Sequence, residues 1–316
     1  MKALLLLAAL LTLSRPAVAG PLQPKQIAED AKWMIHLDVE KLLTTQLGGQ
    51  LGRQVIDRHF AKPTRDLDQW GIEFDWRDIH GLTAYGTDFD KTGNGGAVLV
   101  IDSSFDFTEA LEVVIDRLAA AGSTEQPIEK LQKEPYAVYS AKGEAFGAAF
   151  NKRTFLLAKS RADLEKARSV LDGKARNLAA AKKAPKTLRE TEGFLFAAVT
   201  DGFQTKATLP PQVSGLKSAQ SGQFSAGEKA DKVFVSLSLD TRDAESATKM
   251  QQVLQGLLAL AALSQDANQE LANQELATLV QGARVSGEEN SVHVSLEIPS
   301  EAVLAKIRSS QPRRRK

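Results

Sequence analysis

The chain contains no cysteine, which excludes several kinds of chemistry and of stabilisation at once. Thiol catalysis, a disulfide framework and a lipid-acceptor cysteine near the N-terminus all require this residue. Because no covalent cross-link is available, the protein must be stabilised by burial of apolar side chains.

Signatures of the common catalytic sites are also missing. The sequence has no His-Glu-x-x-His, no Gly-x-Ser-x-Gly, no P-loop and no dinucleotide-binding fingerprint. Ser214–Lys217 and Ser246–Lys249 match Ser-x-x-Lys, but the Ser-Asp-Asn and Lys-Thr-Gly elements that accompany it in penicillin-binding enzymes are absent. We therefore assign no catalytic residue, no metal ligand and no cofactor, and expect a protein that is not an enzyme.

Long hydrophobic runs are scarce. Ala3–Leu13 is apolar but too short to cross a bilayer, and so is Val253–Leu263. Lys2 precedes the first run and Ala17-Val18-Ala19 follows it, which is the pattern of a secretory signal peptide. We expect cleavage near Ala19, a periplasmic or secreted protein, and no membrane span.

Charge is nearly balanced, with 40 Lys and Arg against 39 Asp and Glu. Without the signal peptide and the terminal Arg313-Arg314-Arg315-Lys316, the remainder is acidic by about five charges, which argues against nucleic-acid binding. The four terminal residues Arg313, Arg314, Arg315 and Lys316 give a weak indication of contact with an anionic surface. The alternative is a solvated chain end.

Two stretches share the same order of elements. Val233–Asp240 alternates as a half-buried strand and precedes the amphipathic helical stretch Asp243–Leu263. Ala97–Asp102 and Asp106–Ala121 make the same strand, acidic turn and helix. Asp106 with Glu109 predicts a helix N-terminus and Gly122 its end.

The similarity continues along the chain. The expected strands and last helix of each copy are Tyr136–Ser140, Ala145–Asn151, Thr154–Ser160 and Arg161–Leu171 in the first, and Ala283–Ser286, Ser291–Ile298 and Glu301–Arg308 in the second. Ser160 and Ser300 are the expected N-caps of the last helices. A further strand precedes each copy, Trp33–Val39 in the first and Phe194–Thr200 in the second. Glu40–Phe60 is expected to be a helix weakened by glycines.

The fold expected from this pattern is α+β, with two tandem ferredoxin-like β-α-β-β-α repeats, largely antiparallel sheets and helices on one face. The expected division is a signal peptide at 1–19, a first repeat at 20–173, a basic linker or connecting helix at 174–192, a second repeat at 193–310 and a basic tail at 311–316. The faces expected to be uncovered carry Phe234, Ser236 and Ser238, or Met34, His36 and Asp38.

Candidate binding residues lie on those expected faces. His36 and Asp38 share a strand face, and an imidazole beside a carboxylate is able to bind a metal or relay a proton. A polar, hydrated strand face is the alternative, because a zinc site needs three or four ligands. His293 and Phe234 are further candidates for binding, although no histidine matches His293 in the first copy.

A calcium site is a weaker candidate. Asp88, Asp90 and Gly93 imitate the first half of a calcium-binding loop, but Leu99 stands at position twelve, where a bidentate acid is needed. A glycine-rich hairpin turn explains the same residues.

Two segments resemble a group of uncharacterised exported bacterial proteins. They are Ala31–Asp38, which follows the signal peptide, and the C-terminal motifs Glu275–Leu279, Val285–Gly287 and Val292–Pro299. The resemblance implies a secreted α+β protein and transfers no catalytic residue. We therefore expect an exported, soluble, non-catalytic binding or scaffold protein of the cell envelope, whose partner is a protein or another envelope component. The alternative is a metal-dependent or hydrolytic periplasmic enzyme that uses His36 and Asp38.

Overall fold

The structure is a computed structural model that describes residues 20–89, 96–121, 128–132, 136–181, 193–200, 218–263 and 281–309. Several predictions lie outside these ranges. They concern the signal peptide, the basic tail, Ser214–Lys217, Gly122, residues 90 and 93 of the calcium-like loop, residues 182–192 of the linker and the motif Glu275–Leu279.

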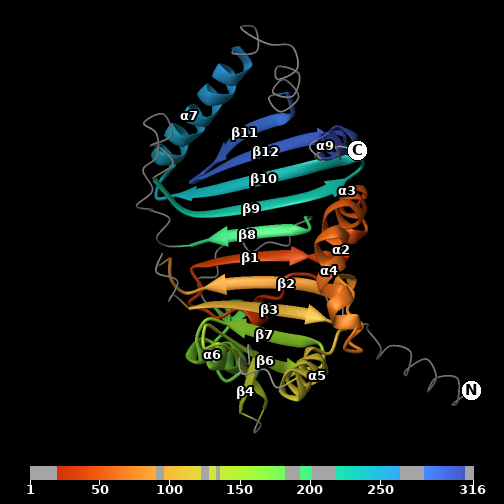
Figure 1. Cartoon of the computed structure of the whole chain (residues 1–316). Coiled ribbons are helices and arrows are strands. Elements are labelled where there is room, and N and C mark those ends of the chain that lie inside the picture. Colours follow the sequence, from red (N-terminus) through yellow and green to blue (C-terminus); the bar gives the residue numbers. More distant parts are fainter. Residues whose placement is uncertain are drawn as a thin grey trace, which may run out of the picture.

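The described residues form a twelve-stranded sheet in which every pairing is antiparallel (Figure 1). The strand order is β11-β12-β10-β9-β8-β1-β2-β3-β7-β6-β5-β4. The expectation of an α+β protein with a largely antiparallel sheet is confirmed. The strands are β1 (Trp33–Asp38), β2 (Ile79–Gly86), β3 (Ala97–Ser103), β4 (Glu129–Gln132), β5 (Val138–Ala141), β6 (Ala145–Asn151), β7 (Thr154–Ala158), β8 (Leu195–Val199), β9 (Ala219–Lys229), β10 (Lys232–Thr241), β11 (Ala283–Glu288) and β12 (Ser291–Pro299).

The two expected repeats meet at the pairing of β1 with β8. Trp33 lies opposite Val199 and Leu37 lies opposite Leu195. The backbone N–H of Asp38 donates to the carbonyl of Phe194, which extends the pairing by one more hydrogen bond. The two halves therefore share one continuous sheet instead of forming two separate ones.

Two of the four helices that follow strands begin at a side chain that the sequence identifies as an N-cap. Asp106 accepts hydrogen bonds from the backbone N–H groups of Thr108 and Glu109, and Ser160 accepts one from Asp163. Ser300, the other expected cap, is itself the first residue of its helix, and its buried hydroxyl has no hydrogen-bond partner among the described residues. These helices are α5 (Phe107–Ala120), α6 (Arg161–Leu171), α7 (Ala244–Leu263) and α9 (Ser300–Ser309).

The expected helix Glu40–Phe60 is divided into short pieces. They are α2 (Val39–Leu43), α3 (Gln46–Leu51), the π-helical turn η2 (Gly52–Ile56) and α4 (Asp57–Asp68). Gly48 permits the tight connection of α2 to α3, because a Cβ atom there would lie 1.8 Å from the carbonyl oxygen of Leu42. Within the described part of the chain, the structure contains no helix with the length and hydrophobicity needed for a membrane span.

Helices lie on both faces of the sheet, so the expectation of helices on one face is wrong. Leu164, Ala167 and Val170 of α6 pack against the face that carries Met34 and Leu156. On the opposite face, α7 packs against Leu239 and Val292, and Phe107 of α5 stacks on Phe155. Because apolar residues of the first repeat point to both faces, each face needs its own cover.

The beginning of the expected linker is part of the core. Leu178, in the short 3-10 helix η4 (Leu178–Ala180), is 4% exposed and donates its backbone N–H to the carbonyl of Ile27. Ile27 follows a second 3-10 turn, η1 (Pro24–Gln26). Ile27 and Leu178 both cover the Met34 face of the sheet. Leu178 therefore joins this segment to the core, while Lys174 and Arg176 are exposed.

Leu156 and Leu157 provide a matched test of the two faces. Leu156 is 0% exposed in the core around Met34, whereas its neighbour Leu157 points to the opposite face and is half-buried. We expect Leu156→Ala to lower the free energy of unfolding by about 2–5 kcal/mol. Urea denaturation measures this change, and Leu157→Ala should cost clearly less. Equal losses would contradict the assignment of the faces.

Candidate functional site

One row of paired residues runs across the sheet on the face opposite Met34, and every side chain in it is apolar. Ile35 of β1 lies at its centre, paired with Ala84 on one side and Ala197 on the other. We call this row the apolar belt. From β11 to β7 it consists of Val285, Val294, Leu237, Phe224, Ala197, Ile35, Ala84, Leu99 and Leu157.

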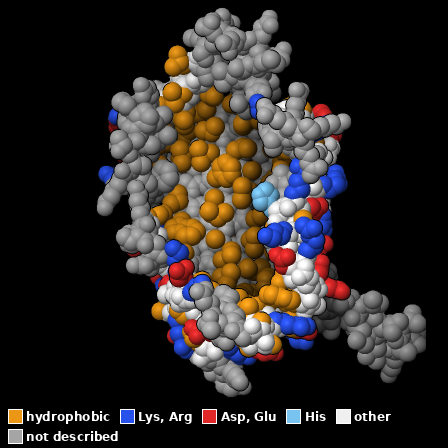
Figure 2. All heavy atoms as spheres, in the orientation of Figure 1, with side chains coloured by type: hydrophobic (Ala, Val, Ile, Leu, Met, Phe, Trp, Pro, Cys, Tyr) orange, Lys and Arg blue, Asp and Glu red, His pale blue; other side chains and the backbone are white. Residues whose placement is uncertain are grey.

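None of the side chains of the belt is fully buried. Ile35 is 48% exposed and the other members are partly exposed. Figure 2 shows the hydrophobic side chains of this face gathered over the middle strands, in a hollow beside the helices. Nine strands spaced about 4.8 Å apart give the belt a length of about 38 Å. An apolar surface this long and continuous is typical of a binding site.

Helices form the margins of the belt. Two residues further along β10 and β12 from Leu237 and Val294, on the same face, Leu239 and Val292 pack beneath α7. At the same spacing on the other side of the belt, Leu37 and Leu195 pack against the cluster formed by α2, α3 and α9. Figure 2 shows Lys and Arg mixed with Asp and Glu on the helical side of the hollow. The belt thus lies at the bottom of a hollow that is flanked by helices, with charged side chains on one side.

The opposite face of the second repeat is polar. Ser225, Ser236 and Ser295 form a paired row on it, on strands that are apolar towards the belt. Two of the expected binding residues lie here. The ring of Phe234 covers Gly227, where a Cβ would come within 2.5 Å of it, and His293 Nδ1 is 2.8 Å from the hydroxyl of Ser238.

His36 and Asp38 lie where the sheet face is covered, so the expectation that Met34 and His36 are uncovered is wrong. His36 is 5% exposed, with Nδ1 2.9 Å from Thr83 Oγ1 and Nε2 2.9 Å from the carbonyl oxygen of Gly20. Asp38 caps α2 by accepting a hydrogen bond from the backbone N–H of Lys41 at 2.8 Å.

The hydrogen bonds of His36 are compatible with a neutral ring, and burial favours that form. The carbonyl of Gly20 only accepts, so Nε2 carries the proton, and Nδ1 accepts from the Thr83 hydroxyl in a neutral ring. Burial lowers the pKa of His36, while the bond to Gly20 and the carboxylates of Asp38 and Asp102 partly oppose this shift. A neutral imidazole with both nitrogens occupied is held as part of the fold.

The four candidate binding residues do not form one site. His36 and His293 lie on the same face, but four strand spacings, about 19 Å, separate them across the sheet. Among the described residues, no group of three or more His, Asp or Glu side chains has the arrangement of a metal site. The structure supports no role for His36 or His293 in metal binding, while a role in binding another partner stays a prediction.

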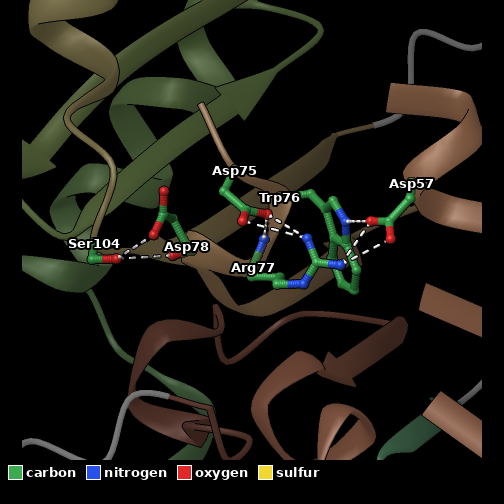
Figure 3. Close-up of polar contacts among 6 residues, drawn as sticks. All are labelled: Asp57, Asp75, Trp76, Arg77, Asp78 and Ser104. Atoms are coloured by element: carbon green, nitrogen blue, oxygen red, sulfur yellow. Dashed lines mark hydrogen bonds and ion pairs between the residues drawn. The ribbon is translucent and has the colours of Figure 1, made fainter. Parts of the chain in front are cut away.

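A charged cluster near α4 has the composition of an active site but the geometry of a structural link (Figure 3). The guanidinium of Arg77 contacts Asp57 at 2.8 Å and Asp75 at 3.0 Å, and the indole of Trp76 donates to Asp57 at 2.8 Å. The Trp76 bond, with Arg77, lowers the pKa of Asp57. Asp57 is therefore a poor base, and the cluster joins α4 to the 3-10 turn η3 (Trp76–Asp78).

A polar cleft of about 620 Å³ lies on the Met34 face, between the N-terminal segment and the β6–β7 turn. Asp102 at its floor accepts a hydrogen bond from Thr154 at 3.1 Å. Lys25, Lys152 and Arg153 also line the cleft. A carboxylate already bonded within the protein and surrounded by cations shows no feature of a catalytic pair.

The apolar belt is not predictable from the sequence, because its residues have the same pattern as a core. Val235, Leu237 and Leu239 alternate regularly, and the usual interpretation of such alternation is a face that is covered. A relevant signal was present in β3, where Leu99 and Ile101 oppose Val98 and Val100. A strand that is apolar on both faces needs two layers of cover, and the sequence does not show that both are provided.

Comparison with known proteins supports the fold alone. A scan against protein-family models finds no match, and a search of curated proteins finds none either. Among solved structures, crystal form IV of TP0453 superimposes with a TM-score of 0.50 at 11% identity, over 92% of this chain and 97% of that one. Crystal forms III and I of TP0453 give TM-scores of 0.47 at 12% and 11% identity, each over 91% of this chain.

The lowered pKa of His36 predicts a specific dependence of stability on pH. An unfolded histidine takes up its proton near pH 6.5, whereas the folded one resists protonation to lower pH. Stability from the neutral ring is therefore complete above about pH 6.5 and is lost as the pH falls towards the folded pKa.

We expect His36→Gln to flatten the pH dependence of the unfolding free energy below about pH 6.5, by up to about 1.4 kcal/mol per pH unit. Urea denaturation at a series of pH values measures this slope. Leu157→Ala, which removes no titratable group, is the control and should leave the slope unchanged. An identical slope in wild type and His36→Gln would contradict the proposed charge state.

Proposed function

We propose that this protein is an exported, non-catalytic binding protein of the bacterial cell envelope, and that it holds the acyl chain of a lipid on the apolar belt. The observation that carries the proposal is the row of partly exposed apolar side chains from Val285 to Leu157. The signal-peptide pattern of residues 1–19 supports export, and envelope lipids are available to an exported protein.

The shape of the belt favours an acyl chain over a second copy of the protein. Stacked sheets approach to about 10 Å, and a helix with its side chains is about 10–12 Å thick. Because α7, α3 and α9 pack on the same face as the belt, they would keep a second sheet from reaching it.

The chemistry of the belt disfavours a peptide. An extended peptide would bring backbone N–H and C=O groups onto a face that offers only Ile35, Leu237 and similar side chains, and these groups would be left without partners. An acyl chain has no such groups. Each buried methylene contributes about 0.8 kcal/mol, so a bound chain of ordinary length has ample driving force.

We also infer that the two halves are tandem copies of one α+β unit, as the sequence pattern suggests. The order β1-β2-β3-β7-β6 in the first half corresponds to β8-β9-β10-β12-β11 in the second. In each half a helix follows the third strand, and another follows the strand paired beside it. This correspondence supports duplication, and it explains why the belt is continuous across the join.

Leu237 and Ser236 allow a test of lipid binding with a matched control. The two residues are neighbours in β10 and point to opposite faces, Leu237 on the belt and Ser236 on the polar face. We expect Leu237→Glu to weaken the binding of a fluorescent long-chain fatty acid at least tenfold, about 1.4 kcal/mol, because a carboxylate would enter the apolar contact.

Fluorescence titration gives the affinity, and mass spectrometry of an organic extract identifies lipid that is purified with the protein. Ser236→Glu should bind like wild type. No saturable binding by wild type, or equal loss in both variants, would refute lipid binding on the belt.

The enzyme alternative has a separate test in the metal content of the purified protein. His36 offers no free ring nitrogen, since Thr83 and Gly20 occupy both. We expect elemental analysis of the purified protein to find no stoichiometric zinc. Zinc at one atom per chain that is lost in His36→Ala would instead favour the alternative enzyme based on His36 and Asp38.

A further inference from the structure

Gly20, the first described residue, lies in a buried position beside β1. Its carbonyl oxygen accepts the hydrogen bond from His36 Nε2, and its φ angle of +141° lies in a region that other residues rarely adopt. This is also the residue before which the sequence predicts signal-peptide cleavage.

Two carboxylates approach Gly20 closely. A Cβ atom built on Gly20 would lie 3.0 Å from Asp38 Oδ1 and 3.0 Å from Glu40 Oε2. The backbone nitrogen shares its Cα with that Cβ position through bonds of about 1.5 Å, which places it within about 6 Å of each carboxylate oxygen. A side chain at this position would require both acidic side chains to shift, and it would also be strained by the positive φ angle. The site therefore suits a glycine whose immediate neighbours are negative charges.

We propose that Gly20 is the N-terminal residue of the mature protein, and that its α-ammonium group forms ion pairs with Asp38 and Glu40. This inference rests on the proposed export. Cleavage adds water across the Ala19–Gly20 peptide bond. Ala19 leaves with the signal peptide as a carboxylate, and the nitrogen of Gly20 becomes an amine that takes up a proton at neutral pH.

The surrounding groups leave room for this charge. Asp38 accepts one hydrogen bond from the backbone of Lys41, and Glu40 contacts His80 Nδ1 at 2.6 Å. His36, which is neutral, is bonded to the Gly20 carbonyl, and the carboxylate of Asp102 acts on His36 as well. A neutral amide in the precursor donates a single hydrogen bond, whereas an ammonium group donates three and supplies a positive charge.

The ion pairs would fix one end of the segment that covers the Met34 face. Ile27 and Ala28 of this segment are buried against the core, and Gly20 is its first described residue. Gly81 of β2 gives the segment space, because a Cβ there would lie 3.1 Å from the Gly20 carbonyl oxygen. Removal of the signal peptide would thus complete the fold only after export.

The test compares two chains with defined N-termini, one beginning at Gly20 and one that retains Ala19. All described elements and core residues lie at or after Gly20, so both chains contain the fold. We expect the chain beginning at Gly20 to melt about 2–4 °C higher at pH 7. The amine is stabilised in its charged form, so this difference should be present below about pH 8 and be lost as the pH rises further.

Asp38→Asn combined with Glu40→Gln is the decisive variant, because asparagine also caps a helix and the fold should be retained. In this double variant the two chains should melt at the same temperature. Equal melting of the unsubstituted chains, or a difference that persists in the double variant, would overturn the ion pairs.

N-terminal sequencing of the exported protein tests the cleavage position independently of lipid binding. Gly20 as the first residue supports the inference, and any other first residue overturns it. Failure of lipid binding on the belt would leave both results unaffected, so the two proposals fail separately.

Discussion

The register of β1 between β2 and β8 is the constraint on which the rest of the structure depends. Pairing of Ile35 with Ala84 and Ala197 aligns the apolar rows of the two halves into one belt, and it places His36 on the opposite, covered face. A slip of one residue in this register would place the imidazole of His36 on the belt and turn Ile35 to the covered face. Burial of Met34 and His36 beneath the N-terminal segment opposes such a slip.

The two faces of the sheet differ in how far the described helices cover them. Met34, Val100 and Leu156 lie in the core formed with α6 and the N-terminal segment. Among the described elements, those that pack on the other face lie at its margins, with α7 on one side, α2, α3 and α9 on the other, and α5 against Phe155. An apolar surface without cover lowers the solubility of a protein, so a surface of this extent is best explained by a ligand that covers it.

Local elements followed closely from the sequence. The helix Arg161–Leu171 has the predicted bounds. Ser160 caps it, because its hydroxyl accepts a hydrogen bond from the backbone N–H of Asp163. Ser300 has the same local sequence signal but does not cap its helix. It is itself the first helical residue, and its buried hydroxyl has no hydrogen-bond partner among the described residues. The difference lies in tertiary packing, where the strand β12 runs directly into α9 without a break.

The alternation of side chains by itself determined that the protein has strands and which residues share a face. Capping residues such as Asp106 and Ser160 determined where two of the main helices begin. Both signals depend only on residues near one another in the chain. Only the tertiary structure decided which face remains open. Trp33, Ile35 and Leu37 are as apolar as a core strand requires, and their exposure depends on helices placed by distant segments. The same holds for Gly20. Its proximity to Asp38 and Glu40 is created by the folding of the N-terminal segment onto β1, a contact that no local pattern encodes.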